Sequence, residues 1–266
     1  MVHSEPRRRP LGYWLASVYA AAVYVFLFAP IGIVVLMSFN SERFSSFPLQ
    51  HFTLEWYANL FADNTIWEAV RNSLVVASGV TLLAVPLGLL AAFVLSRFQF
   101  RLQPAFTSVL VTPLIVPGLI MGISLLLFYN FLHIRTSLAT VILGHTALAL
   151  PYAAQVIAAR LQGFDRRLEE AAASLGAPYH RVFRKITLPL LAPGIIAAAL
   201  FAWTISFDEF ILAFFISGGA GQQTLPLKIW SLLKFGLSPS INAISTIILT
   251  ISLLLVTVAL ALASRR

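Results

Sequence analysis

The chain has 266 residues, of which 59% are hydrophobic and 11% charged, and its mean hydropathy is +0.88. One soluble core cannot bury that much apolar surface, so the composition predicts a protein that crosses a membrane several times. The formal charge of +8 does not indicate nucleic-acid binding, because the basic residues lie in short clusters beside apolar runs and no basic surface with interspersed aromatic residues is formed. Cysteine is absent, which excludes disulfides and thiolate metal sites, and we expect no bound metal.

Apolar runs predict six membrane-spanning helices, because about 20 residues are needed to cross the hydrocarbon core of a bilayer. They cover residues 11–39, 69–95, 104–131, 138–159, 193–216 and 243–263. The first run follows three arginines, as a secretory signal peptide does, but it is too long for a signal core and no clear small-residue cleavage site ends it. We therefore expect a retained helix and an all-α membrane domain over 11–263, flanked by short segments at 1–10 and 264–266.

The positions of the 18 Lys and Arg residues predict the orientation of the chain in the membrane. Basic residues favour the cytoplasmic side of bacterial membrane proteins. With both termini in the cytoplasm, the outer connections hold Arg43, Arg71, Arg135, Lys228 and Lys234, and the other 13 residues face inward. The sequence therefore predicts a cytoplasmic location for both ends and for the polar connection at 160–192.

That connection contains the stretch "EEAAASLGAPYHRVFRKITLPLL", which begins at Glu169. Apolar residues recur at helical spacing from Phe164 to Leu175, Gly176 is a typical helix stop, and Pro178 is a typical start for the next helix. We expect two short helices joined by a turn and lying outside the bilayer. One interpretation is an amphipathic loop on the lipid headgroups. The small residues at 171–174 and the acidic pair Glu169–Glu170 favour a close-fitting protein partner instead.

The same stretch resembles the signature of a transporter family. Glu170-Ala171-Ala172, then three residues and Gly176, then nine residues and Ile186, then one residue and Leu188-Pro189, match without a gap the EAA motif of inner-membrane permease subunits of binding-protein-dependent ABC importers. The resemblance implies a type I importer fold of six helices. It also implies a coupling helix in which Glu170, Ala171, Ala172 and Gly176 contact a separate ATPase subunit, while Ile186, Leu188 and Pro189 fix the return to the fifth span.

The resemblance extends over nearly the whole chain. The stretches at 38–61, 72–98 and 225–249 are similar to the second permease of spermidine/putrescine importers, although permeases for ferric iron, phosphonates and opines share much of the pattern. The implied partners are an ATPase dimer, a second permease subunit, an extracytoplasmic binding protein and the lipid of a bacterial inner membrane. The implied solute is a polyamine.

Catalytic motifs are missing from the chain. It has no phosphate-binding G-x-x-x-x-G-K-[ST], no H-E-x-x-H and no G-x-S-x-G. We therefore expect a non-catalytic transport subunit that binds no cofactor itself, with ATP and magnesium used by the partner ATPase. Two other classes stay open from the residues alone, a carrier driven by an ion gradient and a passive channel or structural membrane subunit.

Two adjacent acids, Asp208 and Glu209, lie in the otherwise apolar fifth run. A carboxylate in a membrane span is costly unless it is hydrated or paired, so such residues often face a cavity. Contact with a cationic solute is one interpretation, and a structural pair or a helix end near the outer interface is the other. In the carrier hypothesis, these acids would bind a proton or sodium instead.

Several other polar or helix-breaking residues leave two interpretations open. Proline and glycine in the third span are compatible with a bend or with close packing, and we favour packing. Polar residues in the second and fourth spans are compatible with the transport pathway or with hydrogen bonds between helices. The residues concerned are Pro113, Pro117, Gly118, Gly122, Asn72, Ser73, His145 and Gln155.

Overall fold

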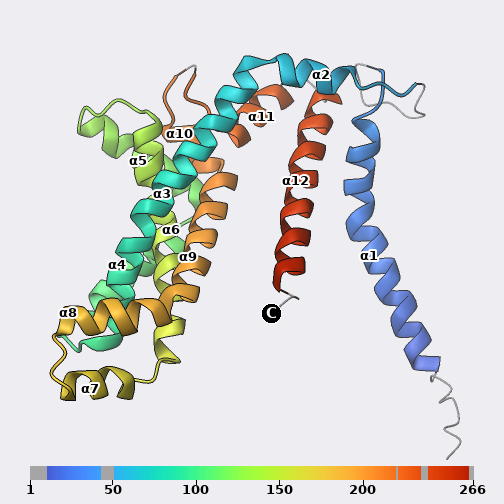
Figure 1. The fold of residues 1–266 in the computed structure, drawn as a ribbon. Coiled ribbons are helices and arrows are strands. Elements are labelled where there is room, and N and C mark those ends of the chain that lie inside the picture. Colours follow the sequence, from blue (N-terminus) through green and yellow to red (C-terminus); the bar gives the residue numbers. More distant parts are fainter. Residues whose placement is uncertain (1–10, 43–50, 220, 235–238, 264–266) are drawn as a thin grey trace, which may run out of the picture. The chain divides into compact units, whose positions relative to one another are not determined.

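The computed structural model describes residues 11–42, 51–219, 221–234 and 239–263, and its regular elements there are helices (Figure 1). The predicted all-α architecture is confirmed. The terminal segments 1–10 and 264–266, which we expected to be cytoplasmic, lie outside the described residues. The chain divides into two compact units, residues 1–63 with 231–266 and residues 64–230.

The first unit contains the helices from both ends of the chain. Helix α1 (Leu11–Met37) and helix α12 (Pro239–Ala263) correspond to the first and sixth predicted spans, and α12 packs against both α1 and the short helix α2 (Glu55–Ala62). The Trp56 indole N–H donates to the Asn40 carbonyl oxygen at 2.7 Å, which fastens α2 to the end of α1. None of the most apolar window of α1 is buried within the chain, as suits a helix surrounded by lipid.

The second unit is built on three long helices that lie side by side (Figure 1). They are α3 (Asn64–Arg97), α6 (Leu138–Gln162) and α9 (Leu188–Asp208), and they confirm as helices the second and fourth predicted spans and the first part of the fifth. Small residues bring them together, because a Cβ atom at Gly88 of α3 would lie 2.9 Å from both the Ala153 Cβ and the Ala154 backbone nitrogen of α6. Close backbone approach at small residues is typical of helix pairs in membranes.

The prediction of one continuous helix over 104–131 for the third span is wrong. The span consists of α4 (Gln103–Ile115) and α5 (Gly118–Phe131), which are bent by 109° at the break between them. Val116 there has an extended backbone, as residues before proline prefer, and Pro117 lacks the N–H that would continue the helix. Gly122 does serve packing, because a Cβ atom there would lie 2.7 Å from the Phe215 ring.

The fifth span, predicted as one helix over 193–216, also has different bounds. One continuous helical stretch runs from Tyr179 to Asp208, and after a break at Glu209 and Phe210 a short helix α10 (Ile211–Ile216) follows. Another short helix, α11 (Leu225–Leu233), comes after the loop that follows α10. Among the described residues, four helices are long and apolar enough to cross a membrane, and the α4–α5 pair makes a fifth if it counts as one span.

Candidate coupling loop and substrate pathway

The predicted pair of short helices is present between α6 and α9. Helix α7 (Arg167–Ser174) is followed by a turn, and α8 (Tyr179–Val182) continues through a π-helical segment, η1 (Phe183–Thr187), into α9. Gly176 has φ +79°, and the N–H groups of Gly176 and Ala177 donate to the carbonyl oxygens of Ala173 and Ala172 at 2.9 and 3.1 Å. These two bonds form a Schellman motif, which explains why the stop residue is glycine.

The residues of the Glu170 to Gly176 motif lie on an open surface. Glu170, Ala171 and Gly176 are exposed, Ala172 is half-buried, and α7 has no buried residue. We expected Leu168 and Leu175 to lie on one apolar stripe. Leu168 is 49% exposed, and Leu175, directly after α7, is 89% exposed. The open surface of α7 and its C-terminal end therefore includes two exposed leucine side chains.

The second part of the motif belongs to the helix that enters the bundle. Ile186 is in η1, while Leu188 and Pro189 begin α9. Pro189 is the second residue of α9 and follows directly on the π-helical segment η1. Ile186 and Leu188 are half-buried and Pro189 is exposed. The three residues therefore shape the start of α9 and not the open surface of α7.

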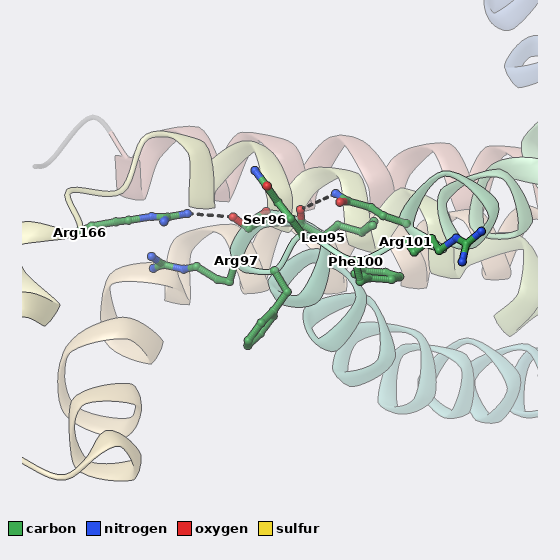
Figure 2. Close-up of a pocket in the computed structure, with 9 residues that line it drawn as sticks. Leu95, Ser96, Arg97, Phe100, Arg101 and Arg166 are labelled. Atoms are coloured by element: carbon green, nitrogen blue, oxygen red, sulfur yellow. Dashed lines mark hydrogen bonds between the residues drawn. The ribbon is translucent and has the colours of Figure 1, made fainter.

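A pocket of about 580 Å³ lies beside this loop, at the C-terminal end of α3 (Figure 2). Its lining is mostly polar and includes Arg97, Arg101 and Arg166. The Arg166 guanidinium donates to the Ser96 carbonyl oxygen at 2.9 Å, and the Gln103 side-chain amide donates to the Leu95 carbonyl oxygen at 3.3 Å. These donors satisfy carbonyl groups that the end of a helix leaves without partners.

The sequence did not reveal which acid of the Glu169–Glu170 pair binds within the chain. Glu169 forms an ion pair with Arg97, with 2.8 Å between Oε2 and Nη2, and accepts a hydrogen bond from Thr187. Glu170 projects into the open. Arg97 lies 72 positions before Glu169 in the sequence, so local spacing carries no sign of this contact.

The structure assigns different surroundings to Asp208 and Glu209. Asp208 is the last residue of α9 and its side chain is exposed. Glu209 is half-buried in the break that follows, and its carboxylate accepts a hydrogen bond from the Leu212 backbone N–H at 2.9 Å. Glu209 thus caps the first turn of α10, which is one of the structural roles considered for this pair.

Aromatic side chains surround the break between α9 and α10. Trp203 and Phe207 stack on α9 with ring centroids 4.9 Å apart, and Phe210 contacts Trp230 with centroids 5.3 Å apart. Phe207 directly precedes Asp208 and Phe210 directly follows Glu209. An exposed carboxylate beside aromatic faces can bind an organic cation by charge and by cation–π attraction.

Other polar residues of the spans form hydrogen bonds between segments. His145 of α6 is 1% exposed, and its Nδ1 lies 3.0 Å from the Ser206 hydroxyl oxygen of α9. Asn72 donates to the carbonyl oxygens of Gly221 and Gln223 at 3.0 Å each, and the Ser73 hydroxyl accepts from the Leu225 N–H at 2.8 Å. Gln155 is exposed.

Comparison with known proteins shows the family. Residues 84–266 match the family described as the binding-protein-dependent transport system inner membrane component. The spermidine/putrescine transport system permease protein PotC of Escherichia coli K12 is 36% identical over 92% of both chains. The putrescine transport system permease protein PotI of the same strain is 38% identical over 85% of this chain and 82% of its own. These relatives are transport subunits, so the expectation of a non-catalytic subunit is confirmed.

Solved structures show the same fold. A bacterial ABC transporter involved in the import of the acidic polysaccharide alginate has a TM-score of 0.74 and 17% identity over 95% of this chain and 96% of its own. The MetNI methionine ABC transporter in an inward-facing conformation has a TM-score of 0.60 and 18% identity over 78% of this chain and 95% of its own. Together with the family match, they confirm the expected permease fold. The chain belongs to the family of inner-membrane permease components of binding-protein-dependent ABC importers, which implies an ATPase and a solute-binding protein as its partners.

Proposed function

We propose that this chain is one of two permease subunits of an importer that moves a polyamine into the bacterial cytoplasm. The exposed Asp208, at a break whose neighbouring residues Phe207 and Phe210 both take part in aromatic pairs, carries the proposal. Polyamines combine ammonium groups with methylene segments, so a carboxylate and aromatic faces together suit both parts. PotC and PotI, which are named as polyamine permeases, add support from similarity.

The exposed surface of α7 supports the proposal for how transport is driven. Glu170, Ala171, Ala172 and Gly176 would contact an ATPase subunit that binds ATP and magnesium, and closure of the ATPase dimer would move the α7 helices of the two permeases. The basic residues Arg166, Arg181 and Arg184 near this loop favour its cytoplasmic location, with both termini on the same side of the inner membrane. The permease then alternates between two arrangements whose populations its partners bias.

The decisive experiment uses the complete complex in proteoliposomes, with the ATPase, the second permease and the cognate binding protein. Spermidine or putrescine should stimulate ATP hydrolysis and accumulate in the compartment that holds the ATPase. Glucose and phosphonate serve as the matched uncharged and anionic solutes. Stimulation by either of these, or by ferric iron, without any by a polyamine would reject the proposed solute.

A second measurement tests the coupling surface. Glu170→Ala removes an exposed carboxylate that has no packing role, so the permease fold should persist while the ATPase subunit binds more weakly. We expect copurification of the ATPase subunit to fall, because one charge-assisted contact contributes about 1.5–3 kcal/mol. Normal copurification and normal uptake together would show that α7 is not the docking surface.

A further inference from the structure

A cluster of side chains joins α7 to the C-terminal end of α3, and we call it the α3–α7 joint. It consists of Arg97 from α3, Glu169 from α7 and Thr187 from η1. The Glu169 carboxylate binds Arg97 through Oε2 at 2.8 Å and accepts the Thr187 hydroxyl through Oε1 at 2.5 Å. The Glu169 carboxylate therefore contacts both α3 and η1.

The joint is shielded from water. The side chains of Arg97 and Glu169 are 12% and 21% exposed, and Thr187 is buried. The guanidinium carbon of Arg97 lies 5.6 Å from the Phe93 ring centroid and 5.4 Å from that of Phe164. Such rings attract the cation and restrict its hydration, so solvent and salt screen this ion pair less than one on an open surface.

A second contact acts at the start of the same helix. Arg166, directly before α7, donates to the Ser96 carbonyl oxygen next to Arg97 (Figure 2). Phe183 of η1 meets Phe93 of α3 edge to face, with ring centroids 5.7 Å apart. Helix α7 has no buried residue of its own, so polar contacts rather than apolar packing hold it against α3.

Glu169 and Glu170 face different ways because consecutive residues of an α-helix are separated by about 100° around its axis. The carboxylate of Glu169 points into the chain, and that of Glu170 stays on the open surface. The two acids can therefore act separately, one within the permease and one toward a partner.

We propose that the α3–α7 joint transmits the movement of α7 to α3 and α9 during transport, with Arg97, Glu169 and Thr187 as positioning residues. The proposal rests on the proposed function, in which an ATPase moves α7. A surface helix transmits a displacement only if it is fastened to the bundle, and the joint supplies fixed contacts to α3 and to the segment that leads into α9. Without the joint, α7 should move while α3 and α9 stay in place.

The first test needs no ATPase and no solute. In the full-length permease in lipid nanodiscs, Glu169→Gln and Arg97→Gln should each increase hydrogen exchange at the α7 amides. Arg101→Gln removes an exposed guanidinium from the same pocket and should leave that exchange unchanged. Unchanged exchange in both joint variants would overturn the proposal, whatever solute the transporter carries.

The second test measures solute molecules moved per ATP hydrolysed in the complete complex. Each joint variant should keep its ATPase subunit, and the ratio should fall roughly two- to thirtyfold. The double variant should be no worse than either single one, because both remove the same link. Two results would overturn the proposal. The single variants could keep the wild-type ratio of solute moved per ATP hydrolysed, or the fold-loss of this ratio in the double variant could equal the product of the fold-losses in the two single variants. Loss of copurified ATPase in Glu169→Gln would also overturn the proposal, since it would place Glu169 in the docking surface.

Discussion

At the scale of residues, adjacent acids in this chain differ in role because the backbone directs them differently. In the helical pair Glu169 and Glu170, one carboxylate is fastened inside and the other is exposed. At Asp208 and Glu209 the helix ends between them, so Glu209 caps α10 while Asp208 stays exposed. The EAA spacing located the loop, but the inward orientation of Glu169 depends on the distant Arg97, which no local pattern could show.

This difference predicts unequal effects of removing each charge at the break. Asp208→Asn should raise the KM for polyamine uptake about tenfold or more, because a hydrogen bond to a charged group contributes about 1.5–3 kcal/mol. Glu209→Gln keeps an oxygen that can accept the Leu212 N–H, so its KM should change less than about threefold. Initial rates of uptake in proteoliposomes measure both. A larger rise in KM for Glu209→Gln would reverse the assignment of the two acids.

At the scale of elements, long apolar runs predicted α1, α3, α6 and α12, but the breaks in the third and fifth spans were missed. Membrane helices often tolerate proline because neighbouring groups satisfy the freed backbone. Pro86 lies inside α3 and Pro151 inside α6, whereas Pro117 stands at the 109° bend. A run of apolar residues does not distinguish these cases, because tertiary packing decides whether the helix continues.

Close packing of α3 on α6 gives a prediction at this scale. Gly88→Ala places a Cβ atom 2.9 Å from the Ala154 backbone nitrogen, which cannot move aside as a flexible side chain can. We expect a loss of about 1–3 kcal/mol in stability, as for other overpacked sites. Gly32→Ala in α1 is the matched control, since nothing lies within 4 Å of its Cβ position. Thermal unfolding in one detergent compares the two, and an equal effect would contradict the packing described.

At the scale of the whole molecule, the chain is a transport subunit and not a catalyst. Its energy source is therefore external, and the family assigns that role to an ATPase. Composition and the EAA motif were sufficient to predict a membrane permease of this family, because hydropathy indicates the spans and the motif has a fixed spacing. The sequence indicated the solute less clearly, because Asp208 and Glu209 were compatible with a structural role as well as with contact to a cationic solute.

The external energy source predicts how uptake responds to inhibitors. Accumulation should stop when ATP is replaced by a non-hydrolysable analogue, because the two arrangements then cannot be cycled. It should continue when ionophores collapse the proton and sodium gradients across the proteoliposome. Radiolabelled solute uptake measures both conditions. Uptake that fails with ionophores and persists without ATP would identify a gradient-driven carrier and contradict the coupling role of α7.

Helix α3 has anchored polar groups near both ends, Asn72 on the loop before α11 and Arg97 on the α3–α7 joint. Their separation of 25 residues corresponds to about 37 Å at 1.5 Å per residue, slightly more than the roughly 30 Å of a hydrocarbon core. Asn72 and Arg97 belong to one continuous helix, so no loop separates these two anchored groups. If the α3–α7 joint transmits movement as proposed, a displacement at Arg97 would reach the loop before α11 along this one helix.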